Sequence, residues 1–354
     1  MIQRIFLILV ILLISSCSST IADFAEYQQS ILPKASFMPT EQMLEGKPPK
    51  VVVLELDNSE DAIVAKQADL GESMAVNIEN ILTAKRLAEL VDRKAAKKLE
   101  KEIALAELNN QAGSYEGPKV ADYAISGIIS DAGFTKKYKS AGIAVDLQGR
   151  ITRTPAKFIY SSEVSGNVKI YDLPSMAVAQ TFEIKGRKIK TENVQADNNV
   201  SVLGVVEFGG QQVKGRDRDD NLVRLAGFEA IDSISYNLQN YFAKKGYILE
   251  KRVNNKKAIF KINLGSEDGI KTGDEFEIIG KFEITNQITE KTQIENRVIA
   301  SGKVSDRINP ESSWVIIKDK KSVDNIRLGD MVKFKYSRSF LNKAAKFAEN
   351  LALN

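Results

Sequence analysis

Histidine is absent from this 354-residue sequence, and cysteine occurs once, at Cys17. Without histidine, catalytic triads with an imidazole base and metal sites built on imidazole are excluded. One cysteine cannot form an intrachain disulfide or a thiolate zinc site. The phosphate-binding loops Gly-x4-Gly-Lys-Ser/Thr and Gly-x-Gly-x-x-Gly are also missing. We therefore expect no enzyme, no metal and no cofactor.

An enzyme remains a weak alternative. The segment Gly71-Glu72-Ser73-Met74-Ala75 loosely resembles a nucleophile elbow, but no histidine is available as the base. We interpret Ser73 as a residue on a helix surface. Carboxylate chemistry is left open, although no motif marks it.

A large excess of charge of one sign is absent as well. Lysine and arginine number 50 and acidic residues 46, giving a net charge of +4 spread along the chain. This balance does not favour nucleic acid as a partner. The apolar content of 43% is that of a globular protein, and the length allows two domains with separate cores.

The N-terminus carries an apolar run over residues 5–14, preceded by Arg4. At about ten residues, this run has the length of a secretory signal and about half that of a membrane-spanning helix. The following Ser15-Ser16-Cys17 resembles a bacterial lipobox, in which the cysteine is lipidated and becomes the mature N-terminus. The residue after the cysteine is Ser18 and not aspartate. This pattern resembles that of lipoproteins that are sorted to the outer membrane. An ordinary signal peptide with a chance cysteine is the alternative.

Periodicity after residue 50 predicts an α+β fold with a mixed sheet flanked by helices. Leu70, Met74, Ile78 and Ile81 form one apolar helix face. A second face consists of Leu225, Phe228, Ile231, Ile234, Leu238 and Tyr241. The expected strands and helices cover, in order, residues 51–58, 69–85, 87–93, 94–108, 123–130, 163–172, 176–185 and 222–243.

Several of these segments resemble the CsgG family, the curli secretion lipoproteins of bacterial outer membranes. The most specific pieces are Asp92-Arg93 after a short strand and Ala121-Asp122-Tyr123-Ala124-Ile125-Ser126-Gly127. The resemblance covers roughly residues 50–245. It implies a homo-oligomeric ring whose protomers are anchored by their lipids.

In that family, two β-hairpins per protomer join into one transmembrane barrel. We expect insertions in comparable places, at residues 135–162 and 187–221. Membrane hairpins need strands of about 9–11 residues that alternate apolar and polar side chains. Ile143 to Leu147 alternate only briefly, and residues 200–208 do so better. We interpret the insertions as periplasmic loops or soluble hairpins, with barrel-forming hairpins as the alternative.

The C-terminal part predicts a small all-β barrel over residues 247–336. Two predicted turns share one sequence pattern, in which an apolar residue, a basic residue and any third residue precede Gly-Asp. The Gly-Asp pairs are Gly273-Asp274 and Gly329-Asp330. Glycine permits a positive φ and aspartate bonds the turn backbone, so we assign these four residues structural roles. The module resembles the C-terminal barrel of the FlgT family. Residues 337–354 predict a final helix.

Together these features predict a signal peptide (1–16), a lipidated tether (17–49), the CsgG-like domain (50–246), the barrel (247–336) and the helix (337–354). We expect a lipid-anchored protein on the periplasmic face of the outer membrane. Its predicted role is a ring-forming scaffold or assembly component of a flagellar or secretion machine. A CsgG-type secretion pore is the alternative. The predicted partners are the membrane, other copies of the chain and other envelope proteins.

Overall fold

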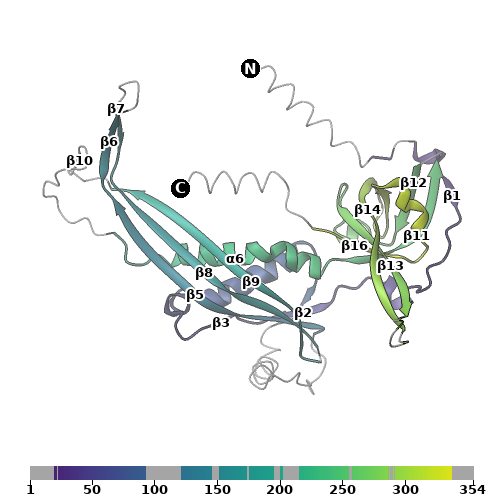
Figure 1. Ribbon diagram of the computed structural model, residues 1–354, viewed down its shortest axis with the longest axis horizontal. Helices are drawn as coiled ribbons and strands as arrows, with labels where there is room; N and C mark the ends of the chain where they lie inside the picture. Colours follow the sequence, from purple (N-terminus) through teal and green to yellow (C-terminus); the bar gives the residue numbers. More distant parts are fainter. Residues whose placement is uncertain are drawn as a thin grey trace. The chain divides into compact units, whose positions relative to one another are not determined.

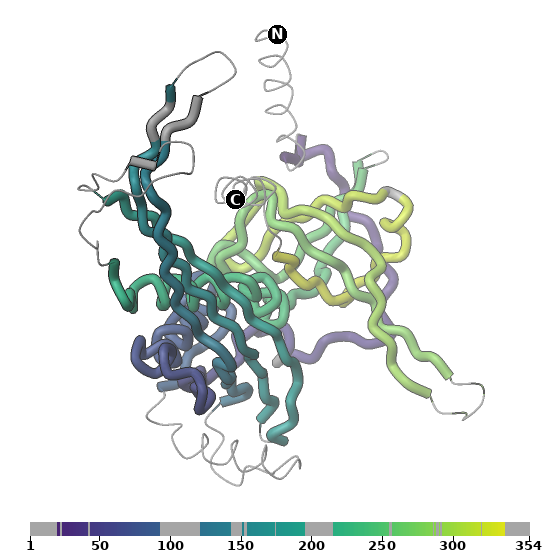
Figure 2. The backbone as a smooth tube through the Cα atoms, turned by 60° about the vertical axis from the view of Figure 1, so that its left-hand side comes forward, coloured from purple at the N-terminus to yellow at the C-terminus, as the bar shows by residue number. Residues whose placement is uncertain are grey.

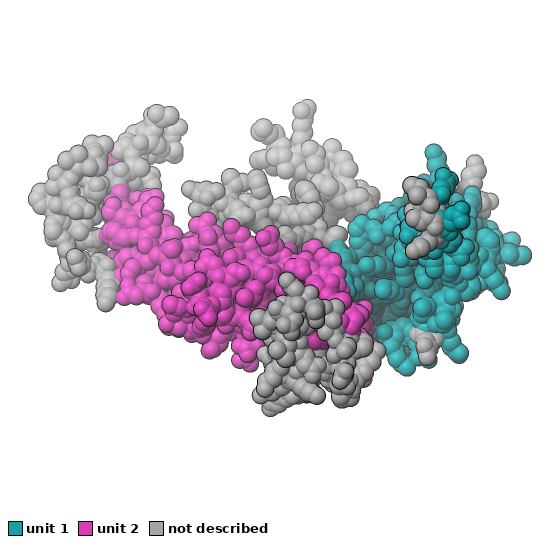
Figure 3. Space-filling view, turned by 60° about the horizontal axis from the view of Figure 1, so that its bottom comes forward, with its two compact units in different colours: residues 1–48, 85–87, 239–337 teal, residues 49–84, 88–238, 338–354 magenta. Residues whose placement is uncertain are grey.

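The computed structural model describes residues 20–21, 23–92, 121–145, 151–173, 175–194, 200–201, 215–254, 257–285, 287, 290 and 292–336. The chain forms two compact units, which Figure 3 distinguishes by colour. The barrel unit contains residues 1–48, 85–87 and 239–337. The sheet unit contains residues 49–84, 88–238 and 338–354.

The sheet unit is built on a mixed sheet of six strands in the order β4-β2-β5-β8-β9, with β3 also paired to β5 (Figure 1). Strands β2, β3 and β4 pair in parallel with their neighbours, whereas β8 is antiparallel to both β5 and β9. The strands are β2 Lys50–Val53, β3 Asp57–Asn58, β4 Glu89–Leu90, β5 Tyr123–Lys139, β8 Lys157–Asp172 and β9 Ala177–Asn193.

The helices of the sheet unit are α3 Ile63–Gln67, α4 Leu70–Ala84 and α6 Asp220–Tyr241. In α4 the fully buried face contains Leu70, Met74 and Ile78 as predicted, but Leu82 completes it in place of Ile81. Four-residue spacing keeps these side chains on one stripe of the helix.

The predicted face of α6 is wrong at its start, because Leu225 and Phe228 are 48% and 39% exposed. Ala226, Gly227 and Ala230 are buried instead. These small residues bring the α6 backbone against Gly186 of β9 and against the side chains of α4. Close approach of a helix to a sheet selects small residues at the contact, and Leu225 and Phe228 lie away from it.

The long strands also change the predicted insertions. Strands β5 and β8 stay paired as far as Lys139 and Lys157, so both ends of the 135–162 segment belong to the sheet. Strand β9 likewise continues to Asn193. Between β5 and β8, β6 Ala141–Val145 and β7 Ile151–Thr154 form an antiparallel pair, and β10 Val200–Ser201 joins β6 in parallel. Because lysines occupy the ends of these strands, the alternation of apolar residues did not indicate that the strands continue.

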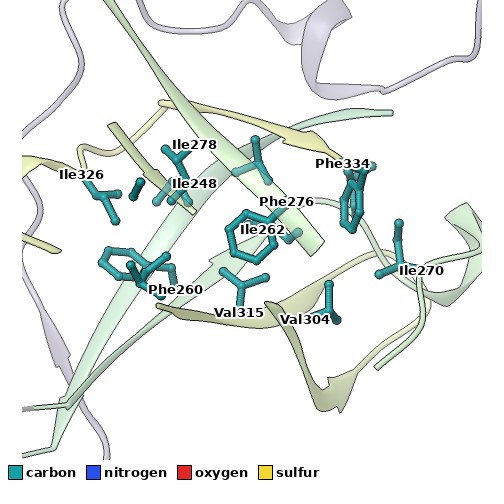
Figure 4. Packing of buried hydrophobic residues seen from close by; sticks show 14 residues of the cluster. Ile248, Phe260, Ile262, Ile270, Phe276, Ile278, Val304, Val315, Ile326 and Phe334 are labelled. Atoms are coloured by element: carbon teal, nitrogen blue, oxygen red, sulfur yellow. The ribbon is translucent and has the colours of Figure 1, made fainter. Parts of the chain in front are cut away.

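The barrel unit, whose strands are drawn in green and yellow in Figure 2, closes six strands into a ring. Their order is β11-β12-β15-β14-β13-β16, with β16 pairing back to β11. Phe260, Phe276, Ile278 and Phe334 lie in its apolar core (Figure 4). The strands are β11 Lys245–Asn254, β12 Lys257–Ile262, β13 Glu275–Thr285, β14 Thr292–Ile308, β15 Ser313–Ile317 and β16 Met331–Phe334. Strand β11 was not predicted, yet the ring closes through it.

The predicted tether over residues 17–49 is wrong for its described part. Residues 20–48, which we call the N-terminal arm, belong to the barrel unit. Strand β1 Gln28–Ser30 pairs antiparallel with β11, and Lys34 forms a parallel bridge with Leu328. The arm also contains the short helices η2 Phe24–Glu26 and α2 Glu41–Leu44. Backbone pairing and buried apolar side chains hold this arm, which its polar, proline-bearing composition did not indicate.

Cys17, the predicted helix 94–108, most of the 200–208 segment and the predicted helix 337–354 lie outside the described residues. Within the described ranges, every helix is too short or too polar to cross a membrane.

Candidate functional site: paired turns and a methionine patch

The two Gly-Asp turns have the same internal geometry. Gly273 and Gly329 adopt φ of 87° and 88°, in the left-handed region that favours glycine. The Lys271 amide donates to Asp274 Oδ2 at 2.9 Å, and the Arg327 amide donates to Asp330 Oδ2 at 2.7 Å. Both aspartates therefore hold their own turn, a structural use of the carboxylate.

The two turns also make matching backbone hydrogen bonds to a neighbouring strand. The Gly273 amide donates to the Val304 carbonyl, and the Val304 amide donates to the Asp274 carbonyl, both at 2.9 Å. Gly329 and Asp330 make the matching pair of bonds with Ile248, at 2.9 and 3.0 Å. The barrel thus consists of two similar halves, β11-β12-β13 and β14-β15-β16, each locked to the other by one turn.

The two turns differ in environment. Asp330 is buried, and this desolvation raises its pKa, although the Arg327 backbone amide and guanidinium oppose the shift. The Lys271–Asp274 bond is exposed to solvent. An acid whose folded pKa is raised stabilises the fold fully below its unfolded pKa, and that contribution is lost as pH rises through the folded value.

We expect Asp330→Ala to destabilise the barrel unit by about 1–3 kcal/mol, because the Arg327 amide loses its acceptor in a partly buried site. Asp330→Asn keeps an acceptor oxygen and removes the buried charge, so it should retain stability at neutral pH. The Asn variant should also lose less free energy of unfolding than the wild type as pH rises above about 4. Urea unfolding across this pH range measures both effects. Asp274→Ala is the matched control and should cost less, and equal losses at the two turns would contradict the assignment.

A pocket lies beside the second turn. Its lining combines the N-terminal arm with β11, β13 and β16, and it includes Phe37, Met43, Tyr247, Ile279 and Met331. Asp330 and Lys281 are the charged members of this lining. The lining is mainly apolar with a few polar groups, as is common in the ligand pockets of proteins.

The apolar lining continues onto the exposed barrel surface. Met38 lies over Gly329 and is exposed, and Val298 is the direct cross-strand partner of Ile279. Three of the six methionines in the sequence occur on this surface. Methionine is frequent at adaptable binding surfaces because its side chain is flexible and polarizable. We call this surface the methionine patch, made of Phe37, Met38, Met43, Ile279, Val298 and Met331.

On the barrel, a second cluster holds the beginning of the N-terminal arm. Ile21 and Tyr27 are buried with Ile259 and Trp314, and Phe24 packs edge-on against Trp314 at 5.2 Å between ring centroids. The Ile21 amide donates to Asp306 Oδ1 at 2.9 Å.

Arg252 reinforces this cluster from β11. Its guanidinium lies 5.3 Å from the Phe24 ring centroid and 5.0 Å from that of Trp314, and it pairs with Glu250. Sequence analysis missed the cluster. The three-residue spacing of Ile21, Phe24 and Tyr27 in an otherwise polar segment was the available signal.

The predicted site residues therefore fall into two groups. Gly273, Asp274, Gly329 and Asp330 lie in the paired turns, and the second pair also borders the methionine patch. Cys17 lies outside the described residues. Within the ranges that the structure describes, no three acidic or cysteine residues gather as metal ligands.

Comparison with known proteins identifies the C-terminal module. Residues 258–334 match the family described as flagellar assembly protein T, C-terminal domain. The match runs from β12 to β16 and omits β11 and the N-terminal arm. The predicted resemblance of the barrel to FlgT is confirmed, whereas the resemblance of residues 50–245 to the CsgG family stays a prediction.

No curated protein sequence matches the chain. Among solved structures, a PelC variant dodecamer from Paraburkholderia phytofirmans is 16% identical, with a TM-score of 0.24, covering 60% of this chain and 97% of that one. A second PelC dodecamer from the same organism is 13% identical, with a TM-score of 0.22 and coverages of 59% and 96%. TM-scores this low do not establish a common fold.

Proposed function

We propose that this protein is an outer-membrane lipoprotein that serves as an assembly or scaffold component of a cell-envelope machine, with the flagellar apparatus as the favoured machine. The observation that carries the proposal is the closed barrel whose residues 258–334 match the C-terminal domain of a flagellar assembly protein. A role in binding and assembly, not catalysis, agrees with a sequence that lacks histidine and phosphate loops.

Two further features support this role. The signal-like N-terminus ending at Cys17 supports export and lipid anchoring to the periplasmic face of the outer membrane. The methionine patch offers an exposed apolar surface to a protein partner. A homo-oligomeric ring is part of the proposal, and the exposed Leu225 and Phe228 on α6 supply apolar surface for contacts between copies.

A CsgG-type secretion pore is the second candidate. The β6–β7 pair lies in the connection between β5 and β8, beyond their last paired residues Lys139 and Lys157, and Ile151 on β7 is exposed. This is the position at which a membrane hairpin would be inserted. Planar-bilayer conductance from intact, detergent-extracted oligomers would favour the pore, and oligomers without conductance would exclude it.

Val298→Glu tests the scaffold role through the methionine patch. Val298 is 58% exposed, so the variant should fold normally, but a charge in an apolar contact should weaken partner binding by about 2 kcal/mol, roughly 30-fold. We expect the wild-type protein in isolated flagellar basal bodies and a strong loss of the variant from them.

Ile63→Glu is the matched control, since Ile63 is 60% exposed and begins α3 in the sheet unit. A glutamate at the start of a helix is well tolerated. Recovery of Val298→Glu in basal bodies at the control level would contradict the patch as the docking surface. Absence of the wild-type protein from basal bodies would contradict the flagellar assignment itself.

A further inference from the structure

The N-terminal arm begins on the barrel almost as soon as the predicted mature chain begins. Ile21 is buried beside Trp314 and its amide is bonded to Asp306. Tyr27 is buried in the same cluster, and residues 28–30 then pair with β11. The point at which the chain becomes fixed is therefore Ile21, not the start of the sheet unit.

The length of chain between Cys17 and this fixed point limits how far the barrel can lie from a lipid on Cys17. An extended chain advances about 3.3–3.6 Å per residue, so the four steps from Cys17 to Ile21 span at most about 14 Å. A tether running freely to residue 49 would reach several times further. Because the arm is docked on the barrel from Ile21 onward, only the residues before Ile21 separate the barrel from the lipid.

We propose that the barrel unit rests against the lipid bilayer, with the face around Ile21, Phe24 and Trp314 turned toward the phospholipid headgroups. This inference rests on the proposed lipidation of Cys17. The occupant of this face is the bilayer surface itself, held there by the short connection. Several contacts of different kinds hold the arm, so the connection stays short while the barrel is folded: the buried Ile21 and Tyr27, the β1–β11 ladder and the Arg252 contact with the Phe24 ring.

Trp314 provides a direct probe, because it is the only tryptophan in the sequence. The acylated mature protein, which begins at Cys17, is reconstituted into phosphatidylethanolamine/phosphatidylglycerol vesicles that contain a small fraction of dansyl-labelled phosphatidylethanolamine. We expect strong energy transfer from Trp314 to the dansyl headgroups.

Two variants lengthen the connection in independent ways. A Gly/Ser linker of about 20 residues inserted between Ser19 and Thr20 adds a flexible span of roughly 25 Å and should reduce transfer several-fold. The double variant Ile21→Ser/Tyr27→Ser should release the arm and also reduce transfer. Unacylated Cys17→Ala added to the same vesicles should show no transfer.

Mass spectrometry of the mature N-terminus separates failure of the inference from failure of the proposed function. An acylated protein without transfer would overturn the placement of the barrel and leave the lipoprotein intact. Transfer that the linker does not change would show that the barrel surface binds lipid without the short connection, which also overturns the inference. A mature chain without acyl groups would overturn both proposals.

Discussion

Gly186→Ala should destabilise the sheet unit strongly, although it adds only one methyl group. A β-carbon at Gly186 would overlap the carbonyl oxygen of Ala226 and the amide nitrogen of Ala230, and would lie 2.9 Å from the Ala230 Cα. These are backbone atoms of α6, so no side-chain rotation relieves the overlap. The helix must move away from β9.

Displacing α6 would disturb the buried side chains that depend on its position, including Ile231 and Leu238. Overpacking in a well-packed core costs about 1–3 kcal/mol, and a contact with backbone belongs at or above the upper end. We expect a loss of about 3 kcal/mol or more in the free energy of unfolding, measured by urea denaturation of the soluble protein without residues 1–16.

Gly133→Ala on β5 is the matched control. Apart from Gly133 itself and its two chain neighbours, no heavy atom lies within 4 Å of a β-carbon at Gly133, so the same chemical change should alter stability by about 0.5 kcal/mol or less. A loss at Gly186 no larger than at Gly133 would show that α6 does not pack closely against β9.

Trp314→Ala should have the second large effect, this time in the barrel unit. Trp314 is only 5% exposed and contacts Phe24, Arg252 and the buried Ile21 cluster. Truncation of a buried aromatic residue to alanine costs about 3–5 kcal/mol. Because these contacts also fix the arm, the segment 21–30 should detach before the barrel itself unfolds.

Limited proteolysis measures the second part of this prediction. The wild-type arm should resist cleavage, whereas Trp314→Ala should be cut within residues 21–30 while the rest of the barrel stays intact. Trp314→Phe retains an aromatic ring in the cluster and should protect the arm nearly as well as wild type. An arm that remains resistant in Trp314→Ala would mean that the β1–β11 ladder alone holds it.

Local features of the sequence predicted much of this structure. The four-residue spacing of Leu70, Met74 and Ile78 placed α4, because one-sided burial of a helix leaves that period in the chain. The repeated Gly-Asp pattern located both barrel turns, since a positive φ and a side-chain acceptor are needed within a few residues of each other. The resemblance of the barrel to FlgT followed from these turns.

Other features gave no such local signal. The outward turn of Leu225 and Phe228 depends on how closely α6 approaches Gly186. Lys139 and Lys157 lie opposite each other at the end of the paired strands, although lysine does not indicate a strand. The methionine patch assembles residues from the arm, β13, β14 and β16, and no linear motif unites them.

The sequence by itself determined the absence of histidine chemistry, the lone Cys17 after an apolar run, and the local elements with a clear period or turn motif. Tertiary structure decided which strand closes the barrel and where the arm docks. Closure depends on the pairing of β11 with β16, and docking depends on Trp314, which lies nearly three hundred residues after Ile21. Periodicity reports only that one side of a segment is buried, whereas the partner that buries it is selected by long-range packing.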